Sequence, residues 1–255
     1  MLSEALRSFH DGVYVVTVES HADRQKNTQD ELGEGNFEFV FGIDQRQFSK
    51  EQLIQEGIYD EKQARELDPK GREMTLAQIC CTHTHLQIYK KMLETGVERA
   101  LIFEDDLVTL PFSTEQMADA LSNVPSDFDV ILWGWFGGRF RPPLGMLQQA
   151  IFHLKHFLGL HKFNHRMIRN AYMRPYNRHF NVAAVNYGTY AYTVTRSGAE
   201  KLIAMNTPIA HICDHATIFG ALRGELKMYV STHQFFGNRS VDPGDPLESR
   251  VPRFS

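Results

Sequence analysis

The chain has 255 residues, of which 42% are hydrophobic and 23% are charged, an ordinary composition for a globular protein without long disorder. Its apolar runs are only a few residues long, so the sequence predicts no membrane-spanning segment. The formal net charge of -4 is unevenly distributed: nine of the 27 Lys and Arg side chains, and none of the 31 acidic ones, lie between Val130 and Ala199. A basic middle within an acidic body indicates a surface that meets an anion.

The start of the chain and its cysteines bear on where the protein is found. The first residues show no apolar run followed by a small-residue cleavage site, so we expect no signal peptide. The cysteines are Cys80, Cys81 and Cys213. They form no CxxC pair, so this spacing does not predict a zinc cluster, and we interpret them as reduced thiols of a cytoplasmic protein.

Short runs of β-branched and aromatic residues alternate with helical patterns along the chain. In chain order the sequence predicts strand 12–18, helix 23–32, strand 37–41, helix 75–93, strands 99–103, 129–134 and 189–194, helix 197–205 and strand 226–230. Thr75 and Gln78 form a capping-box pattern at the start of the longest helix, and Gly96 ends it. This alternation predicts an α/β fold with a mainly parallel central sheet.

Three carboxylates follow the predicted strand 99–103 directly. In open α/β sheets the carboxyl ends of the strands face the ligand crevice. If the strand alternation continues, Glu104 and Asp106 point to one side and Asp105 to the other. Two carboxylates on one side can share Mg²⁺ or Mn²⁺, which would neutralise a departing diphosphate. A solvated acidic turn is the alternative interpretation.

Two further segments carry chemistry that the sequence leaves open. One residue of the Asp214-His215 pair could act as general base for an acceptor hydroxyl. Residues 147–167 carry apolar residues at helical spacing with Lys, Arg and His between them, which predicts one basic amphipathic helix. It either contacts a membrane surface through residues 147–170 or docks on the domain with a solvated basic face.

Several blocks of the chain, in order, resemble glycosyltransferase family 25, the family of lipopolysaccharide, lipooligosaccharide and collagen galactosyltransferases. These blocks are Val13–Val18 with Asp23-Arg24, Phe37–Asp44, Thr75–Leu86, Ala100–Asp106 with its Glu-Asp-Asp motif, Gly188–Tyr192 with Ser197–Leu202, and Asp214. The resemblance implies a GT-A-like, Rossmann-like nucleotide-sugar-binding sandwich. On this basis we expect a single domain over residues 1–240, a basic helical insertion near 139–180 and a C-terminal tail at 241–255.

The resemblance also implies roles for individual residues. Glu104 and Asp106 would hold the Mn²⁺ or Mg²⁺ ion, with Asp214 as a further ligand or sugar contact. Donor-binding roles would fall to four more residues: Asp105 and Thr17 in the nucleotide or sugar region, Asp44 at the nucleoside, and Arg24 at the diphosphate or ribose.

The expected function is a metal-dependent, inverting transfer of a hexose, galactose by resemblance, from a UDP-sugar to a glycan or glycolipid acceptor such as lipopolysaccharide. The alternative is a non-catalytic relative that binds glycans or nucleotide sugars, although all three acids are present. No GxGxxG follows the first strand, which disfavours a Rossmann oxidoreductase or methyltransferase. We expect no nucleic-acid partner, because the basic middle contains no recognition module. Peripheral contact with the inner membrane would follow from the membrane interpretation.

Overall fold

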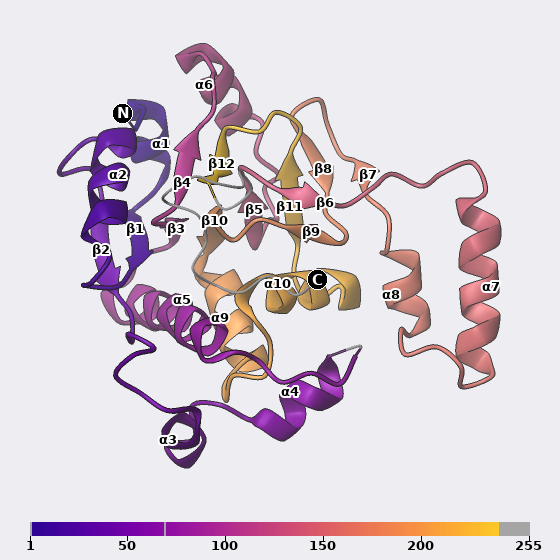
Figure 1. Cartoon of the computed structure of the whole chain (residues 1–255). Helices are drawn as coiled ribbons and strands as arrows, with labels where there is room; N and C mark the ends of the chain where they lie inside the picture. Colours follow the sequence, from indigo (N-terminus) through magenta and orange to yellow (C-terminus); the bar gives the residue numbers. More distant parts are fainter. Residues whose placement is uncertain (1, 69, 240–255) are drawn as a thin grey trace.

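A central sheet of eight strands organises the described part of the chain, residues 2–68 and 70–239 of a computed structural model (Figure 1). The strand order is β2-β1-β3-β10-β5-β11-β8-β7. The pairings give six strands that run in one direction, whereas β10 and β8 run opposite to them. The predicted α/β class with a mainly parallel central sheet is therefore confirmed. The predicted tail at 241–255 lies outside the described residues.

The strands and helices have the following bounds. The sheet strands are β1 (Gly12–Thr17), β2 (Glu38–Phe41), β3 (Arg99–Glu104), β5 (Val130–Leu132), β7 (Arg174–Pro175), β8 (Phe180–Val182), β10 (Ala191–Thr195) and β11 (Met228–Ser231). Two short pairs join β4 (Leu107–Thr109) to β12 (Phe236–Asn238) and β6 (Phe136–Gly137) to β9 (Asn186–Tyr187). The helices are α1 (Glu4–Phe9), α2 (Ala22–Leu32), α3 (Lys50–Gln55), α4 (Glu61–Leu67), α5 (Leu76–Thr95), α6 (Thr114–Ser122), α7 (Gly145–Phe157), α8 (His165–Arg169), α9 (Arg196–Met205) and α10 (Cys213–Arg223).

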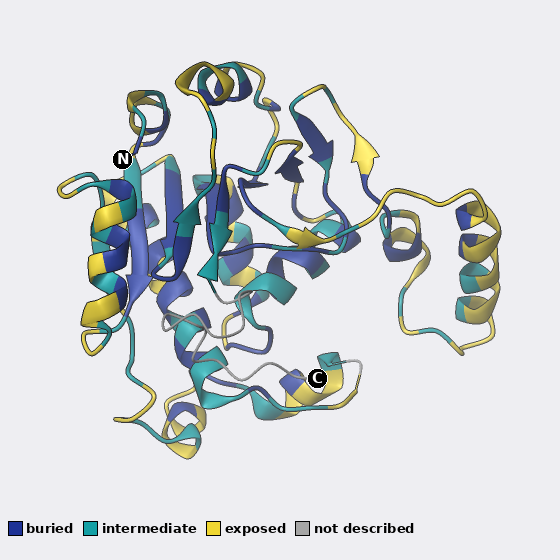
Figure 2. Cartoon of the chain, turned by 45° about the horizontal axis from the view of Figure 1, so that its top comes forward, coloured by how far each residue is buried: buried dark blue, intermediate teal, exposed yellow. Residues whose placement is uncertain are grey.

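Helices cover both faces of the sheet because successive strand residues point to opposite sides (Figure 2). Val16 and Ile102 pack on one side with buried residues of α5, α9 and α10. Val15 and Phe103 pack on the other side with α1, α2 and α6. Each central strand is thus apolar on both faces, which explains why the strand patterns were readable from the sequence.

The longest helix forms as the sequence predicts. The Thr75 side chain accepts a hydrogen bond from the Gln78 backbone, and the Gln78 side chain accepts one from the Thr75 backbone. Gly96 ends α5 in the left-handed region, with φ of 76°.

The predicted single helix over 147–167 is wrong in its extent. α7 ends at Phe157 and α8 begins at His165. Gly159 between them has φ of 71°, a value that breaks a right-handed helix and that glycine adopts without strain. Between residues 41 and 75, where the sequence analysis predicts no helix or strand, Ser49 and Asp60 cap two short helices, α3 and α4.

No helix of the described residues is long and apolar enough to cross a bilayer.

Strand β10 connects the sheet to the site. It lies between β3 and β5 and is antiparallel to both. Its first residues therefore lie beside the carboxyl end of β3, where the Glu104 backbone donates to the Tyr190 carbonyl over 3.0 Å. The loop that precedes β10 is brought to the acidic end of β3 by this reversal.

A buried histidine links α1 to the middle of the sheet. The rings of His10 and Trp133 both contact the Thr193 hydroxyl: His10 Nε2 lies 2.7 Å from it, and Trp133 Nε1 donates over 2.7 Å. His10 Nδ1 lies 2.6 Å from the Leu6 carbonyl. The neutral imidazole ring can make both contacts: Nδ1–H donates to the Leu6 carbonyl, and Nε2 accepts from the Thr193 hydroxyl. Burial lowers the pKa of His10 from 6.5 to about 4, partly opposed by the Leu6 carbonyl.

We predict that His10 makes the protein acid-sensitive. Because its folded pKa lies below its unfolded one, its contribution is complete above about pH 6.5 and is lost as the pH falls towards 4, by up to about 3 kcal/mol. Urea unfolding of wild type and His10→Gln should show the variant less stable at pH 7, with a gap that narrows by pH 4.5. A gap that stays constant with pH would contradict this role.

Candidate active site

A cavity of about 220 Å³ opens at the carboxyl ends of β1, β2 and β3. It is lined by Val16, Thr17, Val18, His21, Arg24, Ile43, Asp44, Gln45, Arg46, Ala77, Cys80, Cys81, Thr84, Glu104, Asp105 and Asp106. Six of the residues that the sequence singled out, Thr17, Arg24, Asp44, Glu104, Asp105 and Asp106, thus share one cavity. All of its lining residues lie between Val16 and Asp106 in the sequence.

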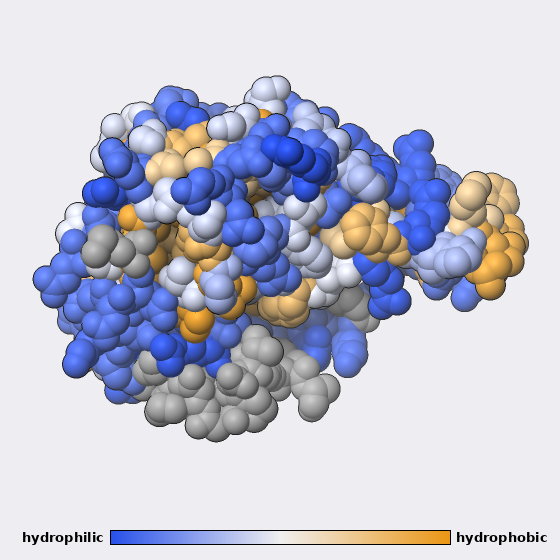
Figure 3. Space-filling model, turned by 90° about the horizontal axis from the view of Figure 1, so that it is seen from above, coloured by the Kyte–Doolittle hydropathy of each residue, from blue (hydrophilic) through white to orange (hydrophobic). Residues whose placement is uncertain are grey.

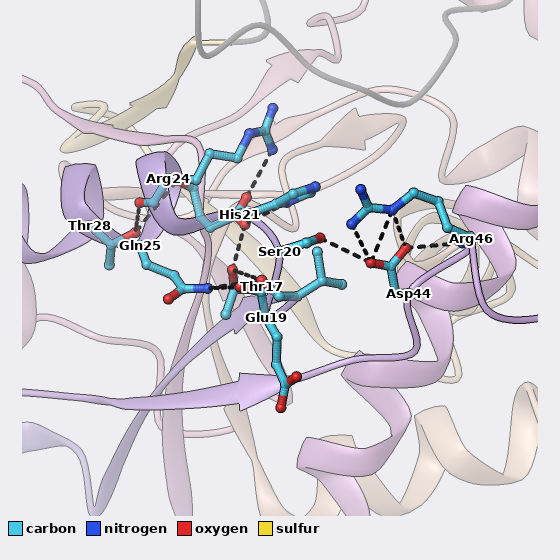
Figure 4. Close-up of polar contacts among 11 residues, drawn as sticks. Thr17, Glu19, Ser20, His21, Arg24, Gln25, Thr28, Asp44 and Arg46 are labelled. Atoms are coloured by element: carbon cyan, nitrogen blue, oxygen red, sulfur yellow. Dashed lines mark hydrogen bonds and ion pairs between the residues drawn. The ribbon is translucent and has the colours of Figure 1, made fainter.

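Asp105 is fixed by groups from the β1 end and from the start of α2. Its two oxygens accept from the Thr17 hydroxyl at 2.7 Å and from Arg24 Nη1 at 2.9 Å, and His21 Nδ1 lies 3.3 Å away. Figure 4 labels Thr17, His21 and Arg24, the three residues that make these contacts. Burial alone raises the pKa of Asp105, but His21, Arg24 and Thr17 outweigh it and hold the pKa below its usual value. Asp105 and Arg24 therefore line the cavity while their charges compensate each other.

Glu104 faces the other side of the sheet. Its Oε1 lies 3.3 Å from the Thr189 hydroxyl oxygen and 3.6 Å from His85 Nε2. Because β3 ends at Glu104, the predicted alternation holds for Glu104 and Asp105 but does not extend along a strand to Asp106. Asp106 is buried in the turn that follows, where its carbonyl accepts from the Arg239 backbone at 2.9 Å.

Asp44 lies across the cavity from these acids, just beyond the end of β2. Arg46 binds both of its oxygens, with Nη2 at 2.5 Å from Oδ2, and the Ser20 hydroxyl donates over 3.0 Å (Figure 4). Arg46 holds the pKa of Asp44 well below its usual value. The cavity wall carries four carboxylates against two guanidinium groups, so its ionised form is net negative.

Both residues of the predicted general-base pair lie in the first turn of α10, but their side chains have different surroundings. Asp214 Oδ1 accepts from the Gly188 and Thr189 backbones at 2.9 and 3.0 Å and from the Thr189 hydroxyl at 3.1 Å. Burial, with the charges of Cys213 and Glu104, raises the pKa of Asp214 to about 7. His215 instead packs against Tyr187 and Phe219, and burial lowers its pKa. Thr189 therefore connects Asp214, but not His215, to Glu104.

Several site residues escaped the sequence reasoning. His21 and Arg46 follow the first two strands closely, as loop residues at a sheet edge should, but no pattern distinguished them. Thr189 was placed in a predicted strand and lies instead in the loop before β10. Cys81 and His85 are four residues apart on α5, a spacing that puts both on one helix face.

A second group of side chains gathers next to the cavity. One ligand atom from each of Cys81, His85, Glu104 and Cys213 lies within 4.8 Å of the others. Among the described residues, the predicted set Glu104, Asp106 and Asp214 is not gathered as compactly.

The fold and the cavity define an α/β protein with an acid-lined cavity at the carboxyl ends of parallel strands. Residues 10–217 match the model of the family described as "Glycosyltransferase family 25 (LPS biosynthesis protein)". The chain belongs to glycosyltransferase family 25, as its sequence blocks predicted.

Two individual proteins are also similar to the chain. A "Glycosyltransferase 25 family member" of Aedes aegypti is 30% identical over 128 residues, which are 48% of this chain and 21% of that protein. The match thus spans about a fifth of the length of this relative. The crystal structure of mannose-1-phosphate geranyltransferase from Thermus thermophilus aligns with 11% identity and a TM-score of 0.36, covering 89% of this chain and 75% of that chain. At that TM-score the likeness supports no inference.

We predict that Arg24→Met destabilises the fold by about 3 kcal/mol at pH 8, because it leaves the Asp105 carboxylate buried without its guanidinium partner. The cost should shrink as the pH is lowered and Asp105 takes up a proton. Urea unfolding at pH 8 and pH 5 measures both effects.

Arg46→Met is the matched control, since it removes a guanidinium whose side chain is 66% exposed and screened by solvent from a carboxylate of the same cavity. Its unfolding midpoint should equal that of wild type. Equal losses in the two variants would contradict a special role for the buried pair.

Proposed function

We propose that the chain is a metal-dependent glycosyltransferase that moves a hexose, galactose in our proposal, from a UDP-sugar to a glycan acceptor such as lipopolysaccharide. The observation that carries this proposal is the cavity in which Glu104, Asp105 and Asp106 meet Asp44 at the ends of parallel strands. Family membership supports the reaction class. Because ligand pockets usually enclose about 300–1,000 Å³, we assign to this smaller cavity the nucleoside and diphosphate rather than the whole donor.

The charge of the cavity favours a divalent cation between protein and donor. A diphosphate would be repelled by the excess of carboxylates, and hard oxygen donors are those that Mg²⁺ and Mn²⁺ prefer. Glu104 and Asp106 would hold the ion, with Asp214 within reach of Glu104 through Thr189. When bound, the ion supplies charge neutralisation to the departing diphosphate.

The other cavity residues orient the donor. Asp44 is held by Arg46 and Ser20 at the cavity edge, and we assign to it hydrogen bonds from the nucleoside. Asp105 and Arg24 fix the wall between β1 and β3, and Thr17 contributes through Asp105. We assign these three a positioning role within donor binding.

In an inverting transfer the acceptor oxygen bonds to the sugar carbon as the bond to the diphosphate breaks, and the acceptor proton passes to a base. A base with a pKa near the working pH is most effective. Of the two candidates, Asp214 meets this requirement and is linked to Glu104 through one hydroxyl. We therefore favour Asp214 over His215.

The acceptor side of the proposal rests on α7, within the insertion that we propose over 139–180. α7 lies beside the body of the protein, joined to α8 (Figure 1). Its buried Gln149 donates to the Ile168 carbonyl at 2.6 Å, so a polar residue faces the domain. Leu144 and Phe157 are 73% and 81% exposed, and an apolar patch covers this end of the molecule (Figure 3). Besides the predicted basic face, α7 and its ends therefore expose a large apolar surface to solvent.

An exposed apolar patch bordered by Lys and Arg suits the surface of an anionic membrane. We propose that α7 docks there, as a peripheral contact of a cytoplasmic protein with the inner membrane, where a glycolipid acceptor would lie. The alternative function is that of a non-catalytic relative that binds nucleotide sugars. Such a protein would have the same cavity, so measurement of catalytic turnover distinguishes it from an enzyme.

We expect purified protein to release UDP from UDP-galactose only with Mn²⁺ or Mg²⁺, and Asp106→Asn to reduce this rate by more than about 100-fold. The loss follows from removing one carboxylate charge from the ion. UDP release, with thermal shifts for a panel of UDP-sugars with and without Mn²⁺, measures it.

Asp119→Asn is the control, because Asp119 is a half-exposed carboxylate on α6 outside the cavity. Its rate should match wild type, and circular dichroism should show both variants folded. Undiminished activity in chelator would eliminate the metal. Donor binding without turnover, with water or lipopolysaccharide as acceptor, would establish the binding protein instead.

We predict that the protein sediments with phosphatidylglycerol vesicles and less with phosphatidylcholine ones. The combined change of Leu147, Leu154 and Phe157 to Ser should abolish this, because it removes most of the exposed apolar area of α7.

Ile54→Ser is the control, since Ile54 is an exposed apolar residue of α3. It should sediment as wild type does. Self-association through α7 in light scattering, without binding to vesicles, would identify a second copy of the chain as the partner and contradict the membrane contact.

A further inference from the structure

Cys81, His85, Cys213 and Glu104 come from three separate elements of the fold. Cys81 and His85 lie on one face of α5, Glu104 ends β3, and Cys213 begins α10. Their ligand atoms lie within 4.8 Å of one another, although Cys81 and Cys213 are far apart in the sequence. The absence of a CxxC motif therefore says nothing about this grouping.

His85 provides an independent sign that a group is missing from the contacts of the cluster. Its side chain is fully buried, and its Nε2 has no hydrogen-bond partner among the described residues. The nearest carboxylate oxygen, Glu104 Oε1, is 3.6 Å away, beyond hydrogen-bond distance. A buried ring nitrogen without a partner is costly, so an additional ligand for it would be stabilising.

The opposite side of the ring is already arranged as in metal sites. His85 Nδ1 lies 2.8 Å from the Tyr192 hydroxyl, which lies 2.6 Å from the Tyr89 hydroxyl. A histidine that ligates through Nε2 usually donates its other N–H to a fixed acceptor. The Thr189 hydroxyl lies 3.3 Å from both Cys213 Sγ and Glu104 Oε1. Two more of the candidate metal ligands therefore also contact a neighbouring polar group outside the cluster.

We propose that Cys81, His85, Cys213 and Glu104 form a zinc site that joins α5, β3 and α10 beside the donor cavity. Two sulfurs, one imidazole and one carboxylate are a donor set that Zn²⁺ takes in tetrahedral geometry. Thiolates select zinc over Mg²⁺ and Mn²⁺, which separates this site from the proposed ion of Glu104 and Asp106. Glu104 belongs to both sites, and its two carboxylate oxygens allow it to bind one ion in each.

The electrostatics of the cluster support a cation there. Glu104 is nearby, and Asp214 follows Cys213 directly. A cation at the cluster would offset this concentration of acidic groups.

Cobalt titration of the whole chain, stripped of metal with a chelator and kept reduced, tests the proposal. Co²⁺ should bind at a single site with thiolate charge-transfer and tetrahedral d–d absorption, and Zn²⁺ should displace it. Zinc should also co-purify stoichiometrically with the untreated protein. A cobalt spectrum without the thiolate band would overturn the site, and this readout needs no variant that might fail to fold.

Variants then assign the ligands. Cys81→Ser, Cys213→Ser and His85→Gln should each weaken cobalt affinity by more than about 100-fold, and Tyr192→Phe by about 10-fold as an outer partner. Cys80→Ser is the matched control, a change at the neighbouring cysteine outside the set, and should bind as wild type does. Unchanged affinity in Cys213→Ser would overturn the proposal.

Two further outcomes distinguish the zinc site from the donor-site ion and from a redox pair. Asp106→Asn should keep its zinc even where it loses UDP release, so failure of the glycosyltransferase proposal leaves the zinc result intact. Formation of a Cys81–Cys213 disulfide on reoxidation, in preference to zinc uptake, would overturn the proposal and identify a redox pair instead.

Discussion

The buried ion pair between Asp105 and Arg24 is the contact on which the cavity depends. It joins the turn after β3 to the first turn of α2, while the Thr17 hydroxyl joins the same carboxylate to the end of β1. Farther along α2, Asn27 donates to the Leu107 carbonyl at 3.2 Å, so α2 contacts the acidic turn at Asp105 and again just after it. These contacts fix the backbone on either side of Asp105, and with it the positions from which Glu104 and Asp106 extend.

Much of the sheet and of the cavity could be predicted from the sequence. Strands buried on both faces are short apolar runs with clear ends, and the carboxyl ends of parallel strands meet at one edge of a sheet. This reasoning alone predicts that Glu104, Asp105 and Asp106 lie at the edge of the sheet where the cavity opens. The family resemblance added Thr17, Arg24 and Asp44, and all six residues line the cavity.

The remainder depends on contacts that no local pattern encodes. The reversed direction of β10 follows from its place between β3 and β5, and this brings Thr189 to Glu104. The break between α7 and α8 depends on a single glycine, a weak signal in an otherwise helical pattern. The approach of Cys81 to Cys213 requires α5 and α10 to pack against each other, which is a property of the tertiary fold.

All residues that line the cavity lie within the first 106 positions, whereas Thr189, Asp214 and α7 follow later. In the proposed function, the earlier stretch of the chain binds the donor and α7 in the later stretch contacts the acceptor side. A substitution on the outer face of α7 would then change the acceptor contact without replacing any residue that lines the donor cavity.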